Sequence, residues 1–150
     1  MVLGCGFCSS ALSIAEELQR RLPPDDLQHQ PEPFTGAHVY LIVDDYDLVA
    51  TNNTANPLAP LIPYIPYAAD IGLHMIVIRR SAGISRALYD PVVGSLREHN
   101  ATLVLFAGDR QEGTIAPGVH LTHQPTGRIR IVRPHSTPIH VQSLLHQGEL

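Results

Sequence analysis

A short apolar strand that ends in two adjacent carboxylates is the feature that most constrains the fold of this chain. Residues 39–43 read Val-Tyr-Leu-Ile-Val, and Asp44 and Asp45 follow at once. A continuous apolar run rich in β-branched residues is typical of a parallel strand covered on both faces. In open α/β sheets the carboxyl ends of strands face the ligand crevice, and carboxylate oxygens are ligands that Mg²⁺ accepts. The pattern therefore predicts an α/β fold with an acidic site at a strand end.

Further strand and helix patterns extend this prediction along the chain. Residues 73–78 and 102–106 read as two more buried strands. Residues 9–22 and 84–99 place apolar side chains near the helical period, and Pro91 is expected to bend the second helix. Alternating strands and helices favour a parallel sheet flanked by helices, with right-handed crossovers.

The C-terminal part of the chain predicts a β-hairpin. Residues 127–132 and 138–144 alternate with a period of two, so that isoleucines face one way and arginines the other. The alternating residues are Ile129 and Ile131 against Arg128 and Arg130. We expect a hairpin or edge pair with one face toward solvent. Three parallel strands plus a hairpin would still leave one sheet edge without neighbours, which predicts a partial sheet whose first strands are missing.

Prolines recur at every third position from Pro57 to Pro66. This spacing fits a polyproline II segment offered to an aromatic groove, which would make the chain a small interaction protein. The residues between the prolines include Leu58, Leu61 and Ile65, which are too apolar for a solvated ligand. A short, irregular helix is the favoured interpretation.

Composition excludes several classes of function. The 150 residues contain no lysine, so they contain no phosphate loop of the G-x-x-x-x-G-K-[ST] type. The ten cations are scattered arginines, the net charge is −4 and aromatic residues make up 5%, so no nucleic-acid partner is expected. No apolar run approaches the roughly 20 residues of a membrane-spanning helix. We therefore expect a cytoplasmic protein without a membrane segment.

The candidate site residues each have two interpretations. Asp44 could hold Mg²⁺ through water and Asp45 could orient an attacking water, or both could simply belong to a strand-end turn, where aspartate is common. The cations Arg79, Arg80 and Arg110 follow the second and third predicted strands, at the sheet edge expected for Asp44. They could contact a phosphate or a neighbouring subunit's nucleotide. Alternatively, they form a salt-bridged rim with Asp70 or Asp90.

Several motifs together resemble one known family. They are V-D-D-Y-D-L-V (43–49), N-P-L-A-P-L-I-P-Y-I-P (56–66), A-x-D-I-G-L-H (68–74), R-R-S (79–81), R-A-L-Y-D-P (86–91) and G-D-R-x-E-G (108–113). From about Ser9 to the C-terminus the chain resembles the last ATPase domain of EccC. EccC is the FtsK/SpoIIIE-type ATPase of type VII (ESX) secretion in mycobacteria and other actinobacteria.

This resemblance implies a RecA-like fold of the P-loop NTPase (ASCE) class. It places Asp44 and Asp45 at the Walker B position, where Asp44 would hold Mg²⁺ through water and Asp45 would be the second, catalytic acid. ATP and Mg²⁺ are the implied cofactors. The implied partners are exported Esx (WXG100) proteins and other EccC chains or domains, at the periphery of an inner-membrane secretion complex.

The resemblance also implies that part of the domain is missing. In the family, the first strand and the phosphate loop (Walker A) precede the segment that this chain matches. We expect residues 1–150 to be a single partial domain, its C-terminal half, with residues 1–8 disordered. Asp44 and Asp45 would then be vestigial, and no independent ATP hydrolysis is expected. The alternative is a split-chain ATPase whose Walker A half comes from another polypeptide.

Overall fold

The computed structural model of the protein describes residues 7–23, 34–50 and 56–143, and the chain divides into two compact units, Met1–Arg79 and Arg80–Leu150. The turn expected at 51–56 and most of the loop expected at 25–36 lie outside the described residues, as do residues 1–6 of the segment expected to be disordered.

The two compact units do not decide the number of domains. Contact units of this kind also occur inside one domain, so the single partial domain stays a prediction. Among the described residues, no helix is long and apolar enough to cross a membrane.

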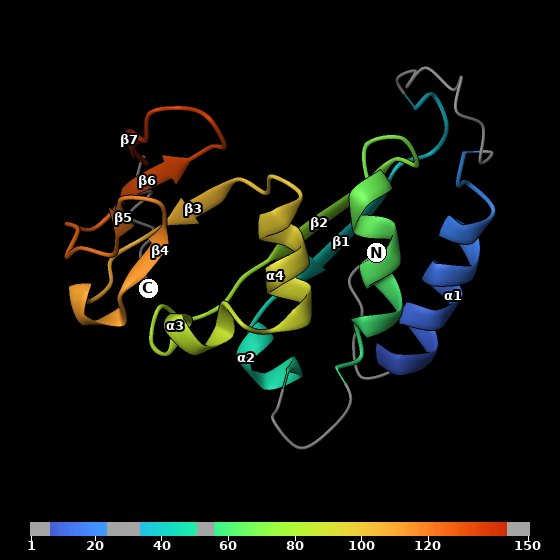
Figure 1. The fold of residues 1–150 in the computed structure, drawn as a ribbon, viewed down its shortest axis with the longest axis horizontal. Coiled ribbons are helices and arrows are strands. Elements are labelled where there is room, and N and C mark those ends of the chain that lie inside the picture. Colours follow the sequence, from blue (N-terminus) through green and yellow to red (C-terminus); the bar gives the residue numbers. More distant parts are fainter. Residues whose placement is uncertain (1–6, 24–33, 51–55, 144–150) are drawn as a thin grey trace, which may run out of the picture. The chain divides into compact units, whose positions relative to one another are not determined.

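Within the described residues, the first unit has two strands and three helical segments, drawn in Figure 1. In chain order they are α1 (Phe7–Gln19), β1 (Val39–Val43), α2 (Tyr46–Val49), the 3-10 helix η1 (Ala59–Tyr67) and β2 (Leu73–Val77). The strands β1 and β2 pair in parallel and in register, from Val39 opposite Leu73 to Val43 opposite Val77. The parallel arrangement predicted for these two strands is thus confirmed.

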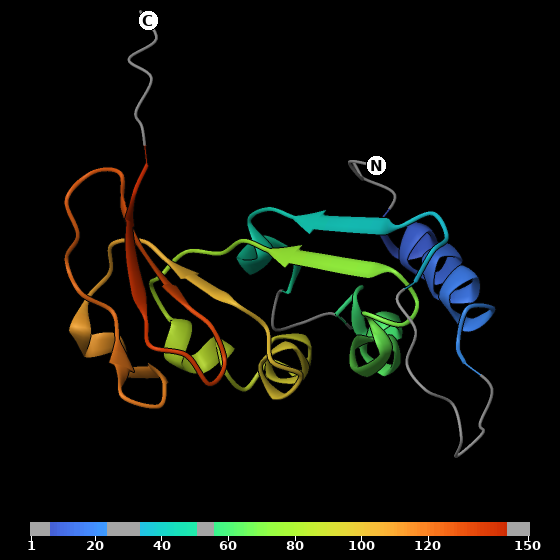
Figure 2. The ribbon, with the colours of Figure 1, turned by 90° about the horizontal axis from the view of Figure 1, so that it is seen from above.

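The two strands bury only one face among the described residues. Leu41 and Val43 are buried on one face of the strands, and Leu73 is buried beside them. Figure 2 shows the helix η1 running on one side of the strand pair. On the opposite face, Tyr40 is 55% exposed, and Ile42 and Ile76 are about half exposed. The prediction of strands covered on both faces is therefore wrong for the described residues, because an apolar run gives no indication of which layers are present.

The 3-10 helix η1 explains the proline spacing. A 3-10 helix has three residues per turn, so side chains three apart form straight stripes. Leu58, Leu61 and Tyr64 form one stripe and are buried, with Leu61 fully so, whereas Pro63 and Pro66 lie on an exposed stripe. Proline at every third position thus removes backbone donors from one solvent-facing stripe only. The short, irregular helix predicted for this segment is confirmed.

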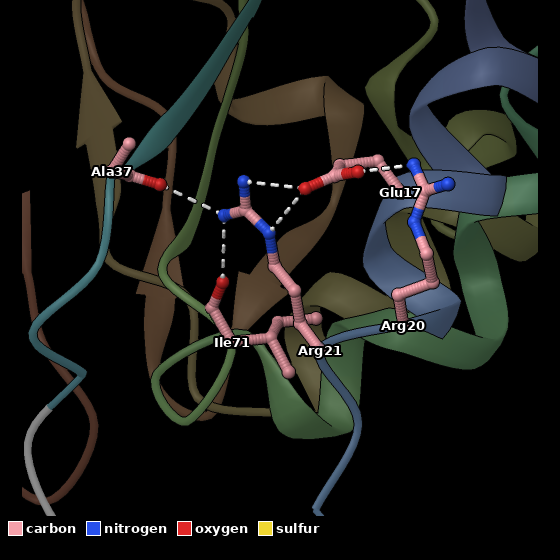
Figure 3. Close-up of polar contacts among 5 residues, drawn as sticks. All are labelled: Glu17, Arg20, Arg21, Ala37 and Ile71. Atoms are coloured by element: carbon pink, nitrogen blue, oxygen red, sulfur yellow. Dashed lines mark hydrogen bonds and ion pairs between the residues drawn. The ribbon is translucent and has the colours of Figure 1, made fainter.

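A single arginine ties three segments of the first unit together. Arg21, just after α1, donates from its guanidinium to the carbonyl oxygens of Ala37 (2.8 Å) and Ile71 (3.3 Å), as Figure 3 shows. The same guanidinium pairs with Glu17 at 3.0 Å and lies over the ring of Phe34, 5.4 Å from its centroid. This side chain is only 17% exposed, so it fixes α1 against the entries to β1 and β2.

Over residues 80–143, the described part of the second unit, there are five strands and three short helices. In chain order they are α3 (Ile84–Ala87), α4 (Pro91–Glu98), β3 (Leu103–Leu105), the 3-10 turn η2 (Arg110–Glu112), β4 (Thr114–Ala116), β5 (Val119–His120), β6 (Arg128–Val132) and β7 (Ile139–Gln142). The predicted C-terminal hairpin is present as the antiparallel pair β6–β7. The sequence did not indicate the small antiparallel pair β4–β5, because each strand is only two or three residues long.

The predicted helix over residues 84–99 is two helices. Asp90 has an extended backbone, and its carboxylate accepts from the backbone N–H groups of Val92 (2.9 Å) and Val93 (3.1 Å). The residue before a proline is disfavoured in the helical region, whereas proline itself is favoured at the first position of a helix. Pro91 therefore starts α4 and does not bend a longer helix, and Asp90 is its N-cap.

One further expectation about the second unit is wrong. The strand β3 pairs with β6 in antiparallel and belongs to the sheet β3–β6–β7, so it is not a third strand of the parallel sheet. In β6, Arg130 donates to the carbonyl of His120, and Val132 on the same face is buried. Opposite lies a cross-strand row of Val104, Ile131 and Ile139, in which Val104 and Ile139 are about half exposed.

Candidate functional site at the end of the first parallel strand

The acidic pair lies where the sequence predicts it, immediately after β1. The backbone is held on both sides by β2 and its extension: Ile78 N–H donates to the Val43 carbonyl (2.8 Å), and Tyr46 N–H donates to the Ile78 carbonyl (2.9 Å). Between these two anchors Asp44 and Asp45 are both exposed. The strand ladder therefore presents two carboxylates to solvent at a fixed place.

The turn at the pair has a left-handed residue. Asp45 has φ 47° and ψ 47°, and its N–H donates to the Oδ1 of Asp44 at 2.9 Å. Aspartate enters the left-handed region more readily than most residues because its short side chain bonds locally. The strand-end turn interpretation and the acidic-site interpretation of this pair are thus compatible: the same turn that needs an aspartate also exposes both carboxylates.

Arg79 is part of a structural ion pair in the first unit. Its guanidinium lies 2.7 Å from the carboxylate of Asp47, in the first turn of α2, and the two side chains are only 16% and 23% exposed. A salt-bridged rim had been expected with Asp70 or Asp90, and the partner is Asp47 instead. The pair links the segment after β2 to the helix after Asp45, so it supports the turn that carries the acidic pair.

The other two candidate cations belong to the second unit. Arg80 and Arg110 are both exposed, and Arg110 opens η2, which Asp109 caps by accepting from the N–H of Gln111 at 2.9 Å. Because β3 is not in the parallel sheet, the argument that placed Arg110 at the same sheet edge as Asp44 fails. A phosphate or inter-subunit role for these two residues stays a prediction.

The described residues fit only part of a magnesium–nucleotide site. Two exposed carboxylates at a strand end suit a hydrated Mg²⁺ ion, which usually keeps several waters. The phosphate-binding lysine has no counterpart in these 150 residues. Across the described ranges, no group of three or more histidine, cysteine, aspartate or glutamate side chains is placed to hold a metal ion. These residues therefore supply the acidic half of such a site and not its phosphate-binding half.

Sequence reasoning missed one pair of chemically capable side chains. His38, just before β1, and His74, in β2, approach to 2.9 Å between Nδ1 and Nε2. They are 36 residues apart in the chain. Their only sequence signal is the strand register, which becomes visible once β1 and β2 are aligned.

Comparison with known proteins gives close relatives and no matching family model. The chain is 42% identical over 120 residues to the ESX-4 secretion system protein EccC4 of Mycobacterium tuberculosis. The matched residues make up 77% of this chain and 10% of that protein. It is 40% identical over 117 residues to the ESX secretion system protein EccC of Thermomonospora curvata, covering 74% of this chain and 9% of that protein. The chain thus spans about a tenth of the length of these relatives.

Solved structures of similar fold also come from EccC proteins. The cytoplasmic domain of the T. curvata type VII secretion ATPase EccC superposes with a TM-score of 0.82 at 35% identity, over 95% of this chain and 17% of that one. A second T. curvata EccC structure, of ATPases 2 and 3 in complex with a signal sequence peptide, has the same score and identity over 95% of this chain and 26% of that one.

The parallel pair β1–β2, its flanking helices and these superpositions define the class: part of an ATPase domain of RecA-like fold. The sequence relatives make the assignment more specific. The chain belongs to the EccC family of type VII (ESX) secretion ATPases.

Proposed function

We propose that this chain works as an EccC-type component of a type VII secretion motor and does not hydrolyse ATP by itself. The observation that carries the proposal is the combination of an exposed Walker B-like acid pair, Asp44 and Asp45, with a sequence that contains no lysine. Phosphoryl transfer depends on positioning and charge neutralisation, and most of both comes from the phosphate loop and its lysine. Two carboxylates without that loop add negative charge where a triphosphate would bind.

Nucleotide binding tests this proposal directly. We expect isothermal titration of the full chain with Mg-ATP to show no saturable binding below the millimolar range, and no phosphate release above buffer. The variant Asp45→Asn should behave like the wild type in both assays. Micromolar binding of Mg-ATP that Asp45→Asn or Asp44→Asn alters would overturn the proposal.

A split-chain ATPase is the second candidate, and the exposure of both carboxylates favours it. In this case another polypeptide would supply the Walker A half and the acid pair would regain its role. Mixing the chain with a separately expressed phosphate-loop segment from an EccC relative should then produce ATPase activity that Asp45→Asn abolishes. The absence of activity, with complex formation shown by gel filtration, would remove this candidate.

We also propose that the partners are exported Esx (WXG100) proteins and other EccC chains, and that the chain acts in the cytoplasm beside an inner-membrane secretion complex. Support comes from the T. curvata EccC structure with a bound signal sequence peptide, over which 95% of this chain superposes. Immobilised chain should retain an Esx heterodimer and should lose it when the C-terminal signal of the Esx protein is deleted. Equal retention of both forms would contradict this assignment.

The proline-rich segment is a weak candidate for a ligand. Leu58, Leu61 and Tyr64 of this segment are buried, and the hydroxyl of Tyr64 donates to Oε1 of Gln19 in α1 at 2.9 Å. A polyproline II ligand would need these residues to be free for a partner's groove. We therefore assign the apolar stripe of this segment to the interior of the first unit.

A further inference from the structure

A histidine just before β1 and a histidine in β2 meet on the exposed face of the parallel pair. His74 lies opposite Tyr40 in the register of β1 and β2, and His38 immediately precedes β1. The backbone there is fixed, because the N–H of Val39 donates to the Gly72 carbonyl at 2.8 Å. His38 Nδ1 and His74 Nε2 are 2.9 Å apart, so one nitrogen donates its proton to the other, and both side chains are exposed.

Aromatic neighbours hold the two imidazole rings in place. The ring of Tyr40 stacks on that of His74, with centroids 4.5 Å apart and planes inclined by 12°. Phe34 meets His38 edge-on, with centroids 5.5 Å apart. Rings fixed by packing on a strand scaffold lose little further freedom when they bind a ligand. Packing and strand register therefore keep the two facing nitrogens within reach of a single ligand.

The distance between the two nitrogens matches the spacing of two ligands on one metal ion. Imidazole is a preferred ligand of Zn²⁺, Cu²⁺ and Ni²⁺, with metal–nitrogen bonds of roughly 2.0–2.1 Å. Two nitrogens 2.9 Å apart at that bond length subtend an angle of about 90°. This is the angle between neighbouring ligands in square-planar and octahedral sites, which Cu²⁺ and Ni²⁺ favour, whereas tetrahedral Zn²⁺ needs a wider separation.

We propose that His38 and His74 form a two-histidine site for a divalent transition-metal ion, with Cu²⁺ preferred, that joins β1 to β2. The ring that donates the proton shifts to its other tautomer, which carries that proton on the nitrogen facing away, and both rings turn so that the two facing lone pairs converge on the ion. Because no group of three or more suitable side chains occurs in the described ranges, water completes the coordination sphere. An ion held between two strands binds the folded state, so it stabilises the first unit by mass action.

Copper titration tests the site. The samples are the full chain with Cys5→Ser and Cys8→Ser, because thiolates also bind copper, and the probe is CuCl₂ alone. We expect one Cu²⁺ site whose electron paramagnetic resonance spectrum shows two imidazole nitrogens. His38→Gln and His74→Gln should each weaken binding roughly tenfold or more and leave one nitrogen in the spectrum.

Folding controls keep the result interpretable. His99→Gln is the matched control, because the Nδ1 of His99 is already engaged with the carbonyl of Ser95 at 2.8 Å. This variant should bind Cu²⁺ like the parent. Cu²⁺ should raise the melting temperature of the parent and of His99→Gln but not of His74→Gln, whose fold is checked by circular dichroism. Unchanged copper affinity in both His38→Gln and His74→Gln, or an equal rise in melting temperature in all variants, overturns the proposal.

Discussion

At the scale of single residues, Arg21 and Arg79 of the first unit stabilise the fold through ion pairs and hydrogen bonds. Arg21 serves two backbone carbonyls and one carboxylate, and Arg79 pairs with Asp47 in a mostly buried position. The planar guanidinium can bond several acceptors in fixed directions, which a lysine ammonium cannot do as well. A chain whose only strong cations are arginines is suited to such contacts.

Replacing Arg21 tests its role as a clamp. Arg21→Met keeps much of the aliphatic stem but removes the hydrogen bonds to the Ala37 and Ile71 carbonyls, leaving these acceptors without that donor. Hydrogen bonds to charged groups contribute about 1.5–3 kcal/mol. We expect the free energy of unfolding, measured by urea denaturation, to fall by about 2 kcal/mol.

Arg20 is the natural control for that experiment. It pairs with the same carboxylate of Glu17 but is 71% exposed, whereas Arg21 is 17% exposed. Exposed ion pairs contribute little, so Arg20→Ala should change stability by less than about 0.5 kcal/mol. Equal losses in the two variants would show that the ion pair with Glu17 matters and the backbone contacts do not.

Glu17 makes a pH-dependent contribution with a definite sign. The hydrogen bond from Arg20, and next that from Arg21, lower the pKa of Glu17 below its usual value. Because the folded pKa lies below the unfolded one, the contribution is present above the ordinary carboxyl range and is lost as pH falls through the folded pKa. We expect Glu17→Gln to be slightly less stable than the wild type at neutral pH and equal to it in acid. A constant difference across pH, in urea midpoints, would contradict this.

At the scale of elements, the 3-10 period of η1 decides which side chains are buried. The stripe through Leu61 faces the interior and the stripe through Pro63 faces solvent. An α-helix would have spread the prolines around its surface and left several backbone carbonyls without donors. The spacing of three is therefore a structural requirement of the segment.

Two substitutions in η1 distinguish the contributions of the buried and the exposed stripe to stability. Leu61→Ala should lower the free energy of unfolding by about 2–5 kcal/mol, because Leu61 is fully buried and its truncation leaves a cavity. Pro63→Ala should cost less than about 1 kcal/mol, mostly through greater freedom of the unfolded chain. Urea denaturation of both variants measures the difference. Comparable losses would mean that the proline stripe is also packed.

At the scale of the whole molecule, both units expose apolar faces of sheets. Ile42 and Ile76 are about half exposed in the first unit, and so are Val104 and Ile139 in the second. Parallel sheets are normally covered on both faces, and a contiguous exposed apolar patch usually marks an interaction site or a tendency to associate. The isolated chain should therefore associate with itself.

Self-association can be tested on the parallel pair. The double variant Ile42→Thr with Ile76→Thr keeps β-branched side chains suited to strands but makes the face more polar. In light scattering after gel filtration, the wild type should show concentration-dependent association that the double variant reduces. Leu12→Thr is the control, since Leu12 is a similarly exposed apolar residue on α1 and should leave association unchanged. A monodisperse wild-type monomer at high concentration would contradict the prediction.

The sequence predicted those parts of the fold that depend on local pattern. The strand into Asp44 and Asp45, its parallel partner, the helix after Ser9 and the C-terminal hairpin are each set by the order of apolar and polar residues. The break before Pro91 was also readable from Asp90, an N-cap residue directly before a proline. It was missed because the helical period continued on both sides of the break.

The candidate site was only half predictable for a similar reason. The exposure of Asp44 and Asp45 follows from their place after a strand. The pairing of Arg79 with Asp47 and of His38 with His74 depends on how two strands align, and no local pattern encodes that alignment. Nor does alternation alone say which face of β6 is buried: Arg130 donates to the carbonyl of His120 in β5, and the isoleucine face is partly open.

The sequence by itself determined the class of fold, the acidic strand end and the absence of a phosphate-binding lysine, because local periodicity and composition are written directly in the order of residues. Only the tertiary structure decided that β3 joins an antiparallel sheet, that Asp47 is the partner of Arg79 and that two histidines meet across β1 and β2. These features arise from strand pairing between distant segments, where hydrogen-bond register and burial are settled by the packed chain as a whole.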